Sequence, residues 1–185
     1  MAAPAGCQLY LAAPAELPPD FAATLSAVLE AAEIACLRLP PRPGIGDLVR
    51  LAQGRGTAVV IEGDSDLAAV LGADGVHLAD LKTYGAARDR LGHDAIIGVS
   101  CDRSRHDAME AGEAGADYVA FAADLELVRW WAELMLVPVV AELESLGQAA
   151  EFAATGAEFI ALGRALWNDP AGASVAMRSL LTFLR

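Results

Sequence analysis

Short apolar runs alternate with longer stretches of mixed polarity along the whole chain. Each run has the length of a buried β-strand, and the stretches between the runs have the apolar spacing of helices. The runs cover residues 9–12, 34–37, 58–61, 75–78, 96–100, 118–121, 137–141 and 159–162. The predicted helices include residues 21–31, 47–53, 105–114, 146–154 and 173–184, and a short helix between residues 121 and 137. Strand and helix therefore alternate eight times.

A short phrase of small residues and an acid recurs before every second run. It reads Gly-Ala-Asp at residues 72–74 and 115–117, Gly-Ala-Glu at 156–158, and Ala-Ala-Glu in a worn copy at 31–33. The copies start 41, 43 and 41 residues apart. Glycine adopts the left-handed backbone of a helix end at little cost, so each copy predicts a helix end that leads into a buried strand. The fixed period predicts a repeated supersecondary unit.

Strands that alternate with helices predict a parallel sheet with right-handed crossovers. Eight strand–helix units favour an α/β fold closed into a compact (βα)8 TIM barrel. The chain has 185 residues, against roughly 250 in typical barrels, so we expect short loops and trimmed helices. An open flavodoxin-like sheet is the alternative. No linker or change of composition divides the chain, and we interpret residues 1–185 as a single domain.

Charge and composition restrict the partners. The formal net charge of −12 repels nucleic-acid backbones and anionic membrane surfaces, so we expect neither as a partner. No apolar stretch approaches the roughly 20 residues that span a bilayer, and no signal peptide is evident at the N-terminus. Cys7, Cys36 and Cys101 form no CxxC pair or disulfide framework, which favours the cytoplasm. The oligomeric state stays open, a homo-oligomer included.

The active site of such a barrel lies at the C-terminal ends of the strands. Arg38, His77 and Ser100 end the second, fourth and fifth predicted strands. His77 suits a general acid or base or a ligand contact, with a structural hydrogen bond as the alternative. Ser100 suits a ligand contact, with capping of a helix or turn as the alternative. We expect no nucleophilic role for Cys101, because no catalytic base is adjacent in the sequence.

The end of the last predicted strand offers a further ligand contact. Gly163 and Arg164 stand where barrels often bind phosphate through backbone N–H groups at a helix start. Arg164 could add a bidentate contact to such a group. The alternative is that Arg164 pairs with Glu142 or Glu144 across the barrel mouth.

Three segments carry a family resemblance. The sequence GADGVHL at residues 72–78, preceded by Asp66-Leu67-Ala68, resembles the central signature of thiamine phosphate synthases and their TenI relatives. Residues 97–100 with 115–119 resemble the next family segment, and residues 137–141 resemble its seventh strand. The resemblance covers most of the chain in order. It implies the barrel fold and an enzyme that joins a phosphorylated thiazole to a pyrimidine pyrophosphate, releasing pyrophosphate with help from Mg²⁺.

Several positions depart from that family's pattern. The motif Gln-Leu-Arg-x-Lys falls on residues 36–40, where the arginine is kept as Arg38 and the glutamine and lysine are lost. The Asn-Asp pair falls on residues 62–63, the second metal carboxylate on Lys82, and the phosphate-binding Gly-Gly turn on residues 143–144. Asp64 and Asp80 lie nearby, so a shifted metal site at these two residues is one interpretation and a surface role the other.

Two functions remain, and the sequence leaves open whether the chain is an enzyme. The first, which we prefer on the sequence, is a diverged member without standard synthase activity. It needs no cofactor, and it binds a small phosphorylated or heterocyclic ligand at the mouth or acts as a regulator or scaffold. The second is an active thiamine-phosphate synthase, with Mg²⁺ and displaced groups such as Asp64, Asp80, Arg38 and Ser100. A TenI-type isomerisation is disfavoured, because residues 122–124 lack a histidine.

Overall fold

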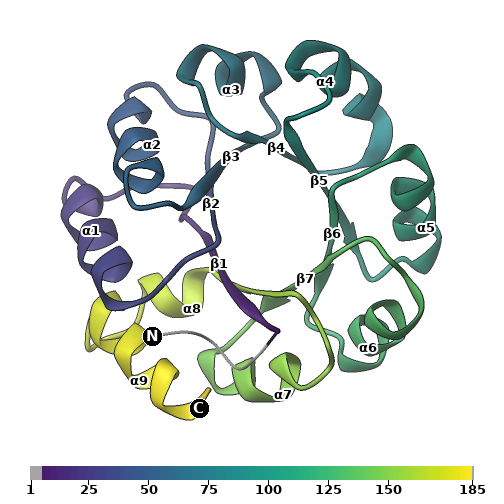
Figure 1. The fold of residues 1–185 in the computed structure, drawn as a ribbon. Helices are drawn as coiled ribbons and strands as arrows, with labels where there is room; N and C mark the ends of the chain where they lie inside the picture. Colours follow the sequence, from purple (N-terminus) through teal and green to yellow (C-terminus); the bar gives the residue numbers. More distant parts are fainter. Residues whose placement is uncertain (1–5, 185) are drawn as a thin grey trace.

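Eight parallel strands close into a barrel in which every strand pairs with its neighbours in the chain (Figure 1). The computed structural model describes residues 6–184. The strands are β1 (Gln8–Ala12), β2 (Cys36–Leu39), β3 (Ala58–Glu62), β4 (Gly75–Leu78), β5 (Ile96–Asp102), β6 (Tyr118–Ala122), β7 (Val139–Leu143) and β8 (Phe159–Leu162). Pairing of β1 with β8 closes the sheet. The (βα)8 prediction is confirmed, and the open flavodoxin-like sheet is wrong.

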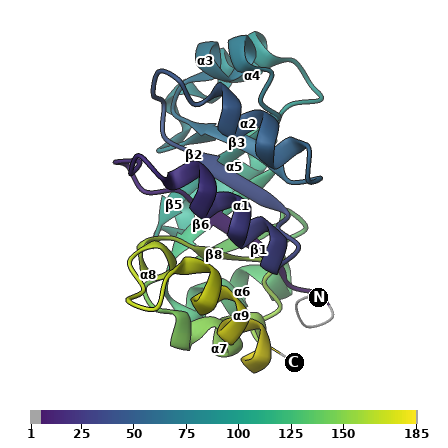
Figure 2. The same ribbon diagram turned by 90° about the vertical axis from the view of Figure 1, so that its left-hand side faces the viewer.

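Short helices surround the barrel (Figures 1 and 2). They are α1 (Phe21–Ala31), α2 (Gly46–Gln53), α3 (Ser65–Leu71), α4 (Tyr84–Leu91), α5 (Arg105–Ala114), α6 (Leu125–Leu134), α7 (Ala149–Ala153), α8 (Arg164–Trp167) and α9 (Ala173–Phe183), with 3₁₀ turns η1 (Leu81–Thr83) and η2 (Leu146–Gln148). The last helix, α9, lies beside α1 and completes the ring. Helices of four and five residues at α8 and α7 show how a short chain completes this fold.

The acid of three repeat copies binds the strand that precedes it in the chain. A carboxylate oxygen accepts a backbone N–H near the N-terminal end of β3, β5 or β7, at 2.7, 2.8 and 2.9 Å respectively. The three pairs are Asp74 with Val59, Asp117 with Ile97, and Glu158 with Val139. These acids therefore stabilise strand starts, at the end of the barrel opposite the expected site.

The glycines of the repeat end their helices as expected. Gly72 and Gly115 follow α3 and α5 with φ of +65° and +93°, in the left-handed region that glycine adopts most readily. In the worn copy, Ala31 takes the place of the glycine and is the last residue of α1, and Ala32 after it has an extended backbone with φ of −148°. An alanine pays a steric penalty in the left-handed region, which explains why the chain leaves α1 differently.

Two packed layers hold the molecule together. The larger one lies between the barrel and its helices, and a small one fills the barrel interior. The interior residues are Tyr10, Cys36, Val60, Tyr118, Ala120, Val140 and Ala161. Gly98 makes room for the largest of them, because a Cβ there would lie 1.9 Å from Cζ of Tyr118. Within residues 6–184, no helix is long and apolar enough to cross a membrane.

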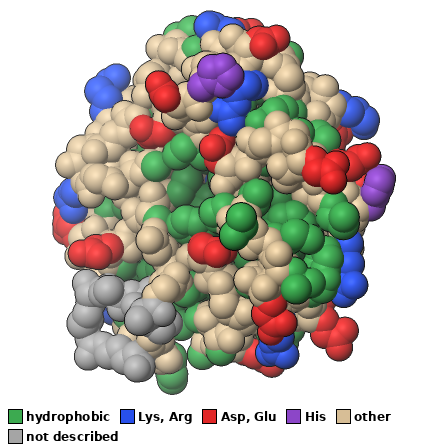
Figure 3. All heavy atoms as spheres, turned by 45° about the vertical axis from the view of Figure 1, so that its right-hand side comes forward, with side chains coloured by type: hydrophobic (Ala, Val, Ile, Leu, Met, Phe, Trp, Pro, Cys, Tyr) green, Lys and Arg blue, Asp and Glu red, His purple; other side chains and the backbone are tan. Residues whose placement is uncertain are grey.

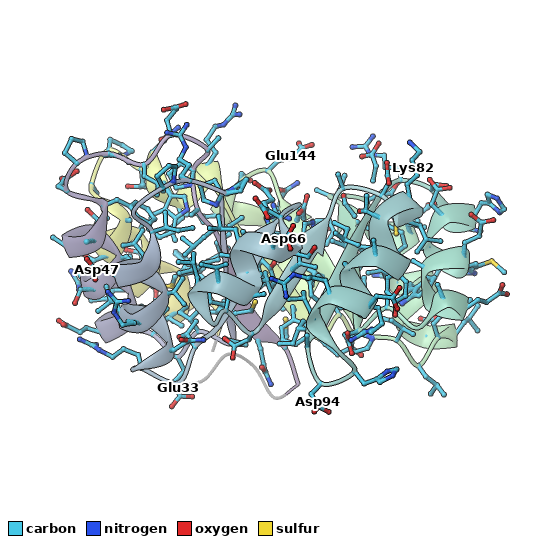
Figure 4. The ribbon with its side chains drawn as sticks, turned by 90° about the horizontal axis from the view of Figure 1, so that it is seen from above. Glu33, Asp47, Asp66, Lys82, Asp94 and Glu144 are labelled. Carbon is cyan, nitrogen blue, oxygen red and sulfur yellow. The ribbon has the colours of Figure 1, made fainter. Side chains whose placement is uncertain are left out.

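The surface carries charges of both signs. On the face drawn in Figure 3, lysines and arginines stand singly among acidic and uncharged groups. Figure 4 separates the two ends of the barrel: Glu144 and Lys82 lie at the end where the strands finish, and Glu33 and Asp94 lie at the opposite end. The strand-finishing end is called the mouth below.

Candidate active site

Alternate residues of the barrel strands place polar side chains around a cavity at the mouth. In each strand every second side chain faces inward, so the last inward position of a strand belongs to the mouth. The cavity has a volume of about 410 Å³. Its lining comprises Arg38, Pro41, Glu62, Gly63, His77, Ala79, Ser100 and Glu142. Sequence reasoning placed Arg38, His77 and Ser100 here, and the structure brings them together.

Arg38 stands at the centre of this cavity wall, between two carboxylates. Its Nη1 donates to Oε1 of Glu142 at 2.7 Å, and its Nε lies 3.4 Å from Oε1 of Glu62. The side chain is 14% exposed. Burial disfavours the charged guanidinium, but the charge and hydrogen bond of Glu142, together with Tyr10 and Glu62, outweigh burial and raise the pKa of Arg38 above its usual value. Arg38 is therefore charged and already neutralised by protein groups.

His77 is buried beneath Arg38 with both ring nitrogens in use. Its Nε2 lies 2.8 Å from Nη1 of Arg38, and its Nδ1 lies 2.9 Å from the hydroxyl of Tyr118. Burial and the positive charge of Arg38 lower the pKa of His77 to about 3. The imidazole is thus neutral at physiological pH, and the structural hydrogen bond is the alternative that the geometry favours over acid–base work.

Ser100 joins the first cavity to a second, larger one. The second cavity has a volume of about 520 Å³ and shares Ala79 and Ser100 with the first. Its ionisable lining groups are Asp80, Lys82, Cys101, Asp102, Arg103, Asp107 and Glu110. Asp102 has a φ of +47°, next to a shift of register between β5 and β6. Burial raises the pKa of Cys101 to about 12, so this thiol stays protonated and is a poor nucleophile, as expected.

Asp64 and Asp80, the metal ligands that the sequence suggested, each cap a helical turn. Asp64 accepts the N–H of Leu67 at 2.8 Å and caps α3. Asp80 accepts the N–H of Lys82 at 2.9 Å, and its second oxygen lies 3.1 Å from Nζ of Lys82. Both carboxylates are engaged in local turns, because each begins a helical turn with free N–H groups.

A further group of potential cation ligands borders the second cavity. Within residues 6–184, the group of three or more potential ligands that lie within 4.8 Å of one another is His106, Asp107 and Glu110, all exposed on α5. Asp107 and Glu110 also line the second cavity. Because Mg²⁺ usually takes only one or two carboxylates together with water and substrate phosphates, a metal site at Asp64 and Asp80 stays a prediction.

Gly163 and Arg164 lie where β8 ends, as predicted, but make none of the expected pairs. Gly163 precedes the four-residue helix α8, and Arg164 is exposed. The expected alternative, a pair between Arg164 and Glu142 or Glu144, is wrong: Glu142 binds Arg38, and Glu144 lies 3.9 Å from Arg103. Within the described residues, Arg164 forms no ion pair.

Sequence reasoning missed Glu62 and Tyr118 as members of this site. Glu62 takes the position of the asparagine in the family's Asn-Asp pair, and Tyr118 looked like one apolar residue of a strand. The available signal was the alternation of inward and outward side chains along each strand. In the structure, Glu62 pairs in register with His77, His77 with Gly98, and Gly98 with Tyr118. Residues in register across a barrel share one layer, so these side chains had to meet.

Comparison with known proteins gives a consistent result. A family model described as thiamine monophosphate synthase matches residues 44–166. The thiamine-phosphate synthase of Rhodospirillum centenum is 40% identical, with 97% of this chain and 98% of that protein covered. The thiamine-phosphate synthase of Hyphomonas neptunium is 36% identical, with 93% and 91% covered.

Solved structures agree on the fold. Thiamine phosphate pyrophosphorylase from Pyrococcus furiosus superimposes with a TM-score of 0.84 at 24% identity, covering 96% of this chain and 95% of that one. Orotidine 5′-phosphate decarboxylase from Pyrococcus horikoshii reaches a TM-score of 0.73 at 16% identity, covering 95% and 99%. At these identities the structures establish only that the barrel architecture is shared.

Proposed function

This chain belongs to the thiamine monophosphate synthase family, and from that premise we propose that it is a working thiamine-phosphate synthase. The reaction joins a thiazole phosphate to a pyrimidine pyrophosphate and releases pyrophosphate. Relatives with this name that match along nearly the whole chain support the second of the two functions considered from the sequence, the active enzyme. We take residues 1–185 as one barrel domain with the site at its mouth.

The observation that carries the proposal is the pair of adjoining cavities at the mouth. Volumes of about 410 and 520 Å³ meet at Ala79 and Ser100. A transferase with two substrates needs two spaces that share a wall, so that the reacting atoms meet at the boundary. The hydroxyl of Ser100, half-buried at this boundary, is placed to hydrogen-bond a substrate from either side.

Departure of pyrophosphate requires positive charge near the leaving group. Arg38 is the cation at the first cavity, and its planar guanidinium suits phosphate oxygens. Lys82 and Arg103 are the cations at the second cavity. Magnesium, when bound, would add the same kind of charge, and Asp64 and Asp80 are the carboxylates that we propose would hold it.

A ligand-binding protein without transferase activity is the second candidate, and one specific observation favours it. The three cations that line the two cavities each face an acidic partner: Arg38 faces Glu142, Lys82 faces Asp80, and Arg103 faces Glu144. Each of these carboxylates repels an approaching phosphate group, which weakens phosphate binding. Such a mouth suits a neutral heterocycle better than a dianion.

Turnover decides between the two candidates. Purified protein, incubated with thiazole phosphate and pyrimidine pyrophosphate in Mg²⁺-containing buffer, is expected to form thiamine phosphate and pyrophosphate in equal amounts. Arg38→Gln is expected to lower kcat/KM by roughly 100-fold or more, because it removes the cation at the leaving group. Arg42→Gln is the matched control, since Arg42 pairs with Glu16 outside both cavities. Binding of the heterocycle without turnover would support the second candidate.

A further inference from the structure

A chain of hydrogen bonds runs from the mouth down through the barrel interior. It starts at Arg38 and passes to Nε2 of His77 at 2.8 Å. From Nδ1 of His77 it continues to the Tyr118 hydroxyl at 2.9 Å, and from there to the Tyr10 hydroxyl at 2.9 Å. Tyr10 packs with Cys36 in the barrel interior. All of these groups except Arg38 are buried.

Arg38 determines which group donates and which accepts in each hydrogen bond of this series. A guanidinium can only donate, so Nε2 of His77 must accept and Nδ1 must carry the ring hydrogen. The Tyr118 oxygen therefore accepts from Nδ1, and its own hydrogen goes to Tyr10. One donor-only group at the mouth thus orders the whole interior.

The packing around Tyr118 holds this chain in place. The rings of His77 and Tyr118 are stacked, with centroids 5.8 Å apart and an interplanar angle of 19°. The Tyr118 ring occupies the space that any side chain at position 98 would need. Tyr10 meets Tyr118 edge-on, with centroids 5.9 Å apart. The tyrosine hydroxyls are therefore held where the histidine needs an acceptor, and they cannot move without repacking the interior.

The same contacts leave one edge of Arg38 available. Nη1 is taken by Glu142 and His77, and Nε faces Glu62. Within the described residues, Nη2 donates to no protein group. We propose that His77 and Tyr118 are positioning residues, which hold the Arg38 guanidinium so that its Nη2 edge meets a phosphate oxygen of the substrate. This inference rests on the proposed function for the identity of the ligand.

The free protein provides the first test, without any substrate. In ¹⁵N NMR spectra of the full chain, the His77 ring is expected to be the Nδ1–H tautomer and to stay neutral down to about pH 5. His93 and His106 are exposed and act as internal references. Their signals are told apart by comparison with His77→Gln. A His77 ring with its hydrogen on Nε2, or one that titrates together with the other two, would overturn the inference.

Tyr118→Phe tests positioning itself, because it keeps the ring and removes the hydroxyl. The Nε–H signal of Arg38, identified with Arg38→Gln, is expected to shift and broaden as the guanidinium loses its fixed support. Tyr84→Phe is the matched control: its hydroxyl donates to the Gly115 carbonyl at 2.6 Å, outside the interior, and its loss should leave that signal unchanged. An unchanged Arg38 signal in Tyr118→Phe contradicts positioning.

Kinetics give the functional readout. Tyr118→Phe is expected to raise KM for the pyrimidine pyrophosphate by roughly fivefold and to change kcat by less than about twofold, because a misplaced Nη2 weakens binding. Tyr84→Phe should match the wild type in both constants. Equal KM values in Tyr118→Phe and wild type overturn the inference. If the wild type shows no turnover, the proposed function fails, and the NMR results alone decide whether Arg38 is positioned.

Discussion

Arg38 shares its charge between two carboxylates that come from other strands. Glu142 lies on β7 and Glu62 on β3, at 2.7 and 3.4 Å from the guanidinium. Two negative groups around one positive group leave the cavity wall with an excess of negative charge. This arrangement holds the arginine in place in the absence of ligand. It also weakens the binding of anionic ligands, because the two carboxylates repel them. The balance between these effects depends mainly on Glu142, which makes the shorter contact.

Glu142→Gln is therefore expected to strengthen anion binding. The amide keeps a hydrogen-bond acceptor for Arg38 and removes the charge, so affinity for inorganic pyrophosphate should rise roughly fivefold, the equivalent of about 1 kcal/mol. Isothermal titration calorimetry measures the change. Glu144→Gln, at the exposed rim beside Arg103, should alter affinity by less than about twofold. Equal or weaker binding by Glu142→Gln would show that the carboxylate does not compete with the ligand.

His77 makes the stability of the protein depend on pH. Its pKa is lowered to about 3 in the fold from about 6.5 in the unfolded chain, so the unfolded state binds the proton more readily between these values. Stability from this group is full above about pH 6.5 and is lost as the pH falls toward 3. Between about pH 7 and pH 5 the wild type should lose about 2 kcal/mol more than His77→Gln, as measured by urea unfolding.

The control for this pH effect is His93→Gln, which replaces an exposed histidine. Its loss of stability on acidification should follow that of the wild type. Parallel curves for His77→Gln and the wild type would contradict the buried, neutral state of His77.

At the scale of elements, the repeated phrase is a device that joins each helix end to the sheet. Its glycine lets the chain turn out of the helix, and its acid binds a backbone N–H of the preceding strand. Such a bond gives a hydrogen-bond acceptor to a backbone N–H near the N-terminal end of a strand, at the end of the barrel opposite the mouth. The phrase therefore explains the architecture, and none of its acids reaches the mouth.

Asp117→Ala tests this role. Asp117 accepts the Ile97 N–H at 2.8 Å and lies 2.7 Å from Arg88. Its loss should lower the free energy of unfolding in urea by about 1–3 kcal/mol, with kcat/KM of the folded protein unchanged within about twofold. Glu113→Ala, on an exposed face of α5, is the control and should change stability by less than about 0.5 kcal/mol. A neutral Asp117→Ala would leave the recurrence of the acid unexplained.

The sequence predicted elements best where the repeat and the capping chemistry agree. The bounds of β4, β8, α1 and α5 are confirmed as predicted. Strand β7 begins two residues later than predicted, at Val139, because Pro138 has no N–H to donate to a ladder. Strand β2 also begins two residues late, at Cys36, opposite Tyr10 of β1. Apolar runs locate strands, but only pairing with a neighbour sets where each one starts.

The site was predicted in part for the same reason. Strand ends identify Arg38, His77 and Ser100, because a barrel brings all of its strand ends to one rim. The partners of Arg38 could not be read from spacing, since Glu142 lies 104 positions away in the chain. Asp64 and Asp80 match a metal ligand in residue type and also serve as caps, and their metal role stays a prediction. Residue type alone does not separate these two roles.

At the scale of the whole molecule, the charge distribution sets the terms for substrate binding. The net charge is −12, and each cation that lines the two mouth cavities has an acidic partner. Anionic substrates must therefore approach against the negative field of the protein and bind beside carboxylates. A synthase built in this way should bind its substrates weakly. The family membership and the two adjoining cavities favour activity despite this cost.

Growth on thiamine-free medium shows whether this chain is a working thiamine-phosphate synthase. The measurement is the growth rate of a bacterial strain that lacks its own thiamine-phosphate synthase and expresses this chain on thiamine-free medium. We predict growth with the wild-type chain and none with Arg38→Gln, at equal levels of folded protein. Absence of growth with the wild-type chain, while the folded protein accumulates, would contradict the claim.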